Sequence, residues 1–165
     1  MRRSSSTMIV IAAGVLLVDE ATKSLARAAL TLCTPPSAAC ERIDLPGGLE
    51  LLRVANEGSG LGFRQGWWLW FLLALAGVLL VLAYARHHGG RVGLALTMGA
   101  GLQLGGAAGN LLDRALFGGA TAFIAVGAVV INLADVALFL GTALATVGLL
   151  RTPAPATNDL ATERG

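Results

Sequence analysis

The chain has 165 residues, of which 55% are hydrophobic and only 13% charged, and its net charge is +2. Soluble domains carry about 25% charged residues. The deficit, with a mean hydropathy of +0.72, indicates that lipid rather than water covers much of the surface. The small net charge and the scattered basic residues exclude a nucleic-acid-binding surface. We therefore expect one integral membrane domain.

The N-terminal apolar run predicts a first membrane-spanning helix over residues 8–30, retained rather than cleaved as a signal peptide. The run is apolar up to Val18, and Asp19, Glu20, Lys23 and Arg27 follow. Charged residues in a span face protein or a wet cavity, and we expect this of the last third of the helix. Asp19 and Lys23 are one helical turn apart and can pair. For this pair alone, an ion pair at the membrane surface is the simpler explanation.

Residues 31–66 are rich in proline and glycine and predict a polar connection outside the lipid. Short strands are expected at residues 43–45 and 49–54, around a Pro-Gly-Gly turn. We expect this segment to form a small subdomain on the membrane surface. Cys33 and Cys40 lie within it. They form a disulfide if the segment faces an oxidising exterior, or they remain two thiols, and their spacing does not fit a zinc site.

Three further membrane-spanning helices are predicted over residues 67–84, 92–112 and 125–150. The second of these is rich in glycine and alanine, which allow close helix packing. Basic residues near the spans favour cytoplasmic termini and place the connection at 113–124 outside. The expected fold is an all-α membrane protein with four transmembrane helices and a small extracytoplasmic β subdomain. Residues 1–152 would form this single domain, with the subdomain at 31–66 and a disordered cytoplasmic tail at 153–165.

Four polar clusters lie at the outer ends of the predicted spans. The first two clusters begin at Asp19 and Asn56, and the last two end at Arg114 and Asp135. The glycines that follow Asn56 either let main chain approach a ligand closely or form a flexible loop. Asp135 lies within an otherwise apolar segment, where a charge costs about 2.5 kcal/mol or more. Such an acid has either a functional task or a structural one, as a hydrogen bond between helices.

Hydrolysis by carboxylates needs two of them close together, one protonated and one ionised, to activate a water molecule. Asp113 and Asp135 are the obvious pair on composition. The predicted spans contain no Ser/His/Asp set, no Cys near a His and no metal-ligand cluster, and His87 and His88 read as solvated turn residues. The candidates are therefore an aspartyl hydrolase, an ion or proton pathway, and a purely structural bundle.

The four clusters, in this order, resemble the lipoprotein signal peptidases (signal peptidase II) of bacteria. The motifs read Asp-x-x-Thr-Lys, Asn-x-Gly, Gly-x-x-Gly-Asn-x-x-Asp-Arg and Asn-x-Ala-Asp, from Asp19 to about Leu140. The resemblance implies a monomeric four-helix aspartyl endopeptidase of the bacterial cytoplasmic membrane, with an extracytoplasmic β-cradle and no metal or cofactor. Its substrate would be a diacylglyceryl-modified prolipoprotein, cleaved just before the lipidated cysteine in the presence of membrane lipid.

By this resemblance, Asp135 matches one catalytic aspartate. The residues that match the family's substrate-binding and supporting motifs are Asp19, Lys23, Asn56, Gly58, Asn110, Arg114, Asn132 and Ala134.

One position departs from the family's pattern. The family usually carries Val-x-Asp-Phe after the Asp-Arg motif, and Ala122 stands where that second catalytic aspartate belongs. No other acid lies between Asp113 and Asp135. Three possibilities follow: Asp113 substitutes as the second carboxylate, the chain binds lipidated peptides without cleaving them, or its acids serve ion or proton movement.

Overall fold

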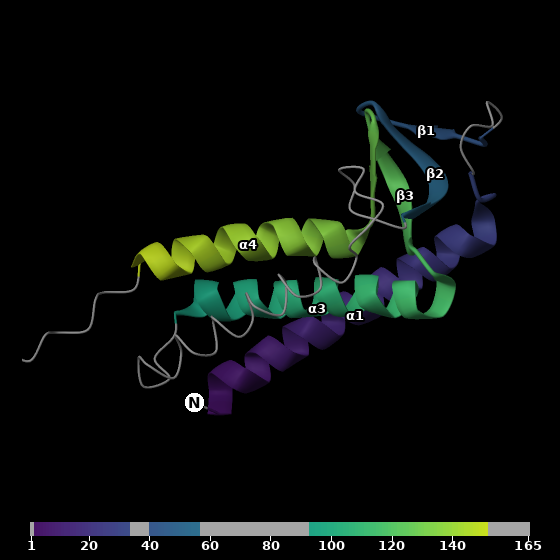
Figure 1. Cartoon of the computed structure of the whole chain (residues 1–165). Helices are drawn as coiled ribbons and strands as arrows, with labels where there is room; N and C mark the ends of the chain where they lie inside the picture. Colours follow the sequence, from purple (N-terminus) through teal and green to yellow (C-terminus); the bar gives the residue numbers. More distant parts are fainter. Residues whose placement is uncertain (1, 34–39, 57–92, 152–165) are drawn as a thin grey trace, which may run out of the picture.

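The computed structural model describes residues 2–33, 40–56 and 93–151. Three long helices run side by side within these ranges: α1 (Arg2–Ala29), α3 (Leu94–Phe117) and α4 (Leu133–Arg151). Figure 1 shows α3 lying between α1 and α4. The span expected at 67–84 and the tail expected at 153–165 lie outside the described residues.

Glycines allow α3 to approach both neighbouring helices at main-chain distance. A Cβ added at Gly99 would lie 2.7 Å from the carbonyl oxygen of Gly141 on α4. A Cβ added at Gly105 would lie 2.6 Å from the carbonyl oxygen of Ala12 on α1. Small residues at such crossings are typical of helices that pack in lipid, where dispersion and weak polar contacts replace the hydrophobic effect.

A four-stranded antiparallel sheet stands at one end of the three helices (Figure 1). Its order is β1 (Ile43–Leu45), β2 (Leu49–Asn56), β3 (Ala120–Val126) and β4 (Val129–Ile131). β1 and β2 match the strands expected between the first two spans. The description as all-α is too narrow, because the sheet takes its other two strands from the segment that precedes α4.

The predicted helix at 125–150 is therefore wrong at its start. Residues 120–131 are as apolar as the helix that follows, so they read as its continuation. They fold instead as a hairpin, because β-branched residues favour strands and Gly127 takes a left-handed φ of 60° at the turn. α4 begins at Leu133.

The other two helices are longer than expected. α1 begins at Arg2 rather than residue 8. α3 continues to Phe117, where Gly118 ends it with a left-handed φ of 78° and donates its N–H to the carbonyl of Arg114. Asp113 therefore lies on a helix and not in a connection. By length and composition, α4 is the one helix in the described ranges that could cross a membrane.

Packing and a disulfide fix the sheet to the end of α1. Phe123 of β3 is buried against Ala26 and Leu30. Cys33 and Cys40 form a disulfide, so the cysteines are not two free thiols. A bulge in β2 frees the carbonyl of Arg53, which accepts a hydrogen bond from the N–H of Cys33 at 2.8 Å. The sheet is thus tied to the first helix just after that helix ends.

Candidate active site

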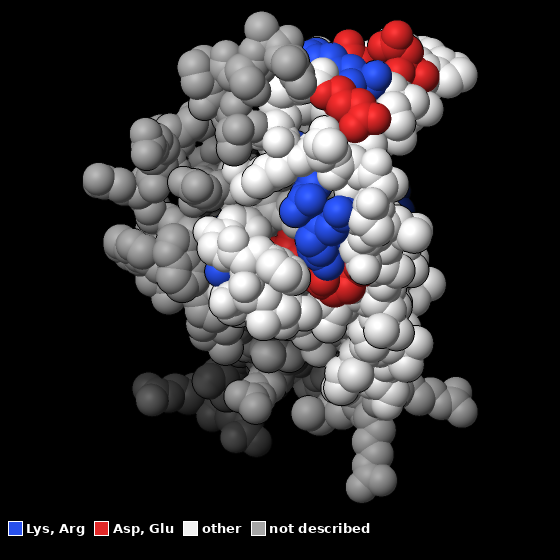
Figure 2. All heavy atoms as spheres, turned by 90° about the vertical axis from the view of Figure 1, so that its right-hand side faces the viewer, with Lys and Arg blue, Asp and Glu red and all other residues white. Residues whose placement is uncertain are grey.

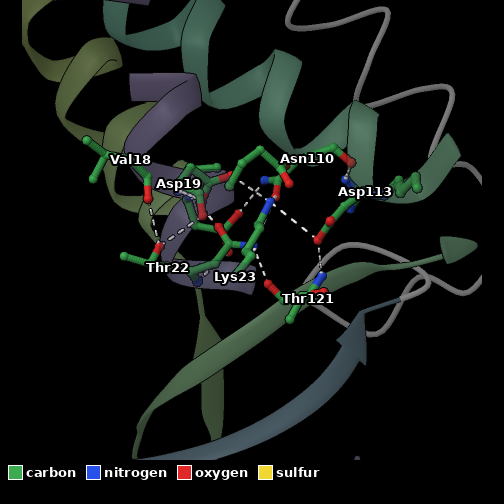
Figure 3. Close-up of polar contacts among 12 residues, drawn as sticks. Val18, Asp19, Thr22, Lys23, Asn110, Asp113 and Thr121 are labelled. Carbon is green, nitrogen blue, oxygen red and sulfur yellow. Dashed lines mark hydrogen bonds and ion pairs between the residues drawn. The ribbon is translucent and has the colours of Figure 1, made fainter. Parts of the chain in front are cut away.

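Charged side chains gather where the sheet meets the helix ends. Figure 2 looks at this end and shows basic and acidic groups set in a hollow of an otherwise uncharged surface. The close-up in Figure 3 shows Lys23 extending from α1 toward Asn110 and Asp113 of α3, with Thr121 of β3 beside them. The polar residues of α1 and α3 therefore meet at one place, as expected from the positions of their motifs, and Thr121 of β3 joins them.

Asp19 and Lys23 form an ion pair at 2.7 Å in which both side chains are fully buried. The predicted pairing is therefore confirmed, and the pair lies inside the protein rather than on its surface. Asp19 Oδ1 also accepts the main-chain N–H of Ala134 at 2.8 Å, so this acid of α1 caps the first turn of α4. A Cβ at Gly109 would collide with the Asp19 carboxylate, which explains why a glycine faces it.

Asp135 lies in the first turn of α4 and not deep inside a span. Its N–H donates to Asn132 Oδ1 at 2.9 Å, and its own Oδ2 accepts the N–H of Asn132 at 3.1 Å. This reciprocal arrangement is a capping box, and the helix dipole favours a carboxylate there. Asp135 is half-buried, so it combines a fixed orientation with access to a reactant.

Asn110 connects the two halves of the cluster. Its Nδ2 donates to Asp135 Oδ1 at 2.8 Å. Its Oδ1 accepts hydrogen bonds from Lys23 Nζ at 3.1 Å and from Asn132 Nδ2 at 2.9 Å. Two hydrogen bonds to Oδ1 and one from Nδ2 therefore fix this buried amide, which in turn holds the carboxylate of Asp135 in place.

Asp113 is fully buried, and both of its oxygens accept hydrogen bonds from protein groups. Oδ1 accepts from Arg27 Nη1 at 2.8 Å, and Oδ2 accepts from the N–H of Thr121 at 2.6 Å. Lys23 Nζ lies 3.6 Å from Oδ2. In the described part of the chain, no hydrogen bond joins Asp113 to Asp135. The two acids are linked indirectly, through Lys23 and Asn110 on one side and through Thr121 and Asn132 on the other.

Ala122 is fully buried in the middle of β3, opposite Val54 of β2. Because side chains alternate along a strand, its methyl group lies on the face opposite to Thr121 and Phe123. Phe123 faces α1, so Ala122 points away from that helix.

Arg114 lies beside this cluster, whereas Asn56 lies at the end of a strand. Arg114 Nη1 donates to the carbonyl of Asn110 at 3.1 Å, and Asp135 and Asp113 both attract its charge. Asn56 is the last residue of β2 and pairs with Ala120. Gly58 lies outside the described residues.

Two residues of the cluster were missed from the sequence. Arg27 bonds both Asp113 and Thr121 Oγ1, the latter at 3.1 Å, and its guanidinium lies 4.5 Å from the ring centre of Phe117. Its position one turn after Lys23 continues the polar face of α1 and could have indicated it. Thr121 acts largely through its main chain, since its carbonyl accepts from Asn132 Nδ2 at 3.0 Å. Main-chain contacts leave no signal in a sequence.

The chain is similar to known proteins over most of its length. A sequence model of signal peptidase (SPase) II matches residues 11–151. A lipoprotein signal peptidase of Gloeobacter violaceus is 39% identical over 121 residues, covering 67% of this chain and 68% of the relative. One of Azoarcus sp. (strain BH72) is 32% identical over 151 residues, covering 87% of this chain and 82% of the relative. The chain belongs to the signal peptidase II family.

The fold is also that of solved membrane proteins. Two structures of bacterial membrane enzymes match with TM-scores of 0.69 and 0.65, at 21% and 23% identity. They cover 91% and 90% of this chain, and the match covers 95% of each of those chains. With its family and this fold, the chain is a membrane protein. Three of the four motif clusters, those of α1, α3 and α4, lie together around Asp135. The match of Ala122 to a catalytic position of the family stays a prediction.

Proposed function

We propose that this chain performs the signal peptidase II reaction, removing signal peptides from diacylglyceryl-modified prolipoproteins in the bacterial cytoplasmic membrane. The observation that carries this proposal is the environment of Asp135. Its carboxylate is half-buried and held by Asn110 and Asn132 at the junction of helices and sheet. An acid so oriented is suited to take a proton from a water molecule that attacks a peptide carbonyl.

The reaction also requires a second carboxylate beside Asp135. We propose Asp113 as its source in this chain, since it is the other acid of the α3 motif. Its buried position, with hydrogen bonds from Arg27 and Thr121, means that it would act through the Lys23–Asn110 connection rather than by direct contact with Asp135. Asp19, Lys23, Asn56, Gly58, Arg114, Asn132 and Ala134 would hold the substrate or support the acids.

A second candidate function is binding of lipidated signal peptides without cleavage. The specific observation in its favour is the methyl group of Ala122 on β3, together with the full occupation of the Asp113 oxygens. Removing one member of a catalytic constellation typically lowers the rate by several orders of magnitude. Both candidates share one substrate class and differ only in turnover.

A gel-shift cleavage assay in detergent micelles separates them. The substrate is a diacylglyceryl-modified prolipoprotein, and the proteins are the wild type, Asp135→Asn and Ala122→Asp. Cleavage by the wild type that Asp135→Asn abolishes supports the peptidase. Cleavage that appears only in Ala122→Asp supports the binding protein. If the wild type neither cleaves the lipoprotein nor binds it, both candidates are wrong.

The membrane arrangement is part of the same proposal. α1, α3, α4 and the segment at 67–84 would be the four spans of a monomer, within one domain of residues 1–152. Both termini, with the tail at 153–165, would be cytoplasmic, and the sheet extracytoplasmic. Support comes from the mean hydropathy of 2.0 over α4 and from its exposed Phe139 and Leu150, which suit contact with lipid. Cysteine labelling from either side of a sealed vesicle tests this topology.

A further inference from the structure

β4 is an edge strand of the sheet. Among the strands of the described ranges it pairs with β3 alone, in the register Val126↔Val129, Ala125↔Val130 and Ile124↔Ile131. The two-residue loop of Gly127 and Ala128 joins the two strands, which makes a tight hairpin. Edge strands carry main-chain groups that a further strand can pair with.

The register identifies which groups these are. In a hairpin with a two-residue loop, the residues flanking the loop exchange both hydrogen bonds, so Val126 and Val129 form a hydrogen-bonded pair. The next pair, Ala125 and Val130, is then a non-hydrogen-bonded pair. The N–H and C=O of Val130 therefore point away from β3, toward the open edge. Within the described ranges, no main-chain hydrogen bond outside the hairpin uses them.

This edge leads directly to Asp135. β4 ends at Ile131, and Asn132 follows as the cap of α4. Main-chain groups point to the open edge at every second residue of the strand, so the N–H of Asn132 faces the same edge as the N–H of Val130. It donates to Asp135 Oδ2 at 3.1 Å. The carboxylate of Asp135 thus occupies the place on the edge where the carbonyl of a neighbouring strand would accept this hydrogen bond.

We propose that β4 binds the substrate residues around the scissile bond as an added strand of the sheet. An extended peptide pairs with the N–H and C=O of Val130, and its next peptide group then lies against the Asp135 carboxylate. Main-chain pairing of this kind binds peptides with little dependence on their side chains. The substrate class rests on the proposed function, whereas the mode of binding rests on the geometry of β4.

The test is binding of a fluorescent diacylglyceryl lipopeptide that spans the cleavage site, to the full chain in detergent micelles. Val130→Pro removes the outward N–H, and proline is tolerated on edge strands at such positions. Val130→Ala, the matched control, trims the side chain but keeps the N–H. One lost hydrogen bond corresponds to about a 3- to 10-fold higher Kd, which we expect for Val130→Pro and not for Val130→Ala.

Hydrogen exchange on the wild type provides a second measurement that does not depend on the folding of a variant. Saturating lipopeptide should slow exchange at the amide of Val130. If binding leaves this exchange rate unchanged and Val130→Pro binds as the wild type does, the added strand is wrong while the proposed function stands. If the wild type does not bind the lipopeptide at all, both are overturned.

Discussion

Asp19 and Asp135 lie on different helices, yet both carboxylates bond the N-terminal end of α4. Asp19 accepts the N–H of Ala134 at 2.8 Å, and Asp135 accepts that of Asn132 at 3.1 Å. The orientation of Asp135 therefore depends on α1 as well as on its own helix. A substitution of Asp19 in α1 should therefore alter the orientation of Asp135 in the candidate active site.

Replacing Asp19 by alanine should destabilise the chain strongly. The substitution removes the cap of α4 and leaves the buried ammonium of Lys23 without its closest partner. Breaking a buried ion pair typically lowers the free energy of unfolding by about 3–5 kcal/mol. Denaturant unfolding in micelles measures this. Glu20→Gln, which changes a partly exposed acid on the same helix, should cost less than about 1 kcal/mol. Equal losses in the two variants would contradict the role of Asp19.

Two glycine-to-alanine changes should have opposite effects. At Gly109 the new Cβ collides with the carboxylate of Asp19, so either that side chain or α3 must move. Such overpacking costs about 1–3 kcal/mol. At Gly14 no atom lies within 4 Å of the new Cβ, so alanine should stabilise α1 by about 0.5–1 kcal/mol. Thermal unfolding of the two variants compares them directly. If Gly109→Ala unfolds at a higher temperature than the wild type, the new Cβ does not collide with the Asp19 carboxylate.

Arg27 should matter more than its partial exposure suggests. Arg27→Ala leaves the fully buried Asp113 without its shortest ion pair and removes the link to Thr121. We expect a loss of several kcal/mol, together with faster hydrogen exchange across β3. Arg27→Lys should recover part of the stability, because the charge remains while the paired N–H geometry is lost. Arg42→Ala removes the exposed pair with Glu50 and should change little. If Arg42→Ala is as destabilising as Arg27→Ala, the burial of Asp113 does not make its ion pair with Arg27 more important than an exposed one.

The cysteines should be oxidised in protein exported to an oxidising compartment. Alkylation of the unfolded chain should then label no thiol without reductant and two thiols after reduction, since the chain contains only Cys33 and Cys40. Mass spectrometry counts the labels. Two labels before reduction would mean that the bond does not form in the cell.

The sequence was informative where physical constraints are local. The helical polar face of Asp19 and Lys23 and the repeated Asn-x-x-Asp spacing predicted which residues would meet. The start of α4 was not found, because the hairpin before it is as apolar as the helix. Asn132, followed three residues later by Asp135, is a capping signal that could have marked the boundary. The contacts of Thr121 could not be predicted, since they use main-chain groups brought together only by the tertiary fold.

The hydrogen bond between Asp19 and Ala134 joins residues 115 positions apart in the chain. During synthesis α1 is complete long before α4 exists, and until then Lys23, one turn away, is the nearest neutralising partner of Asp19. The carboxylate cluster can therefore assemble only after the start of α4 has been synthesised. A prematurely released fragment that ends before α4 would contain α1 and α3 but no functional centre. Assembly of the site is thus a late event in biogenesis, because it waits for α4.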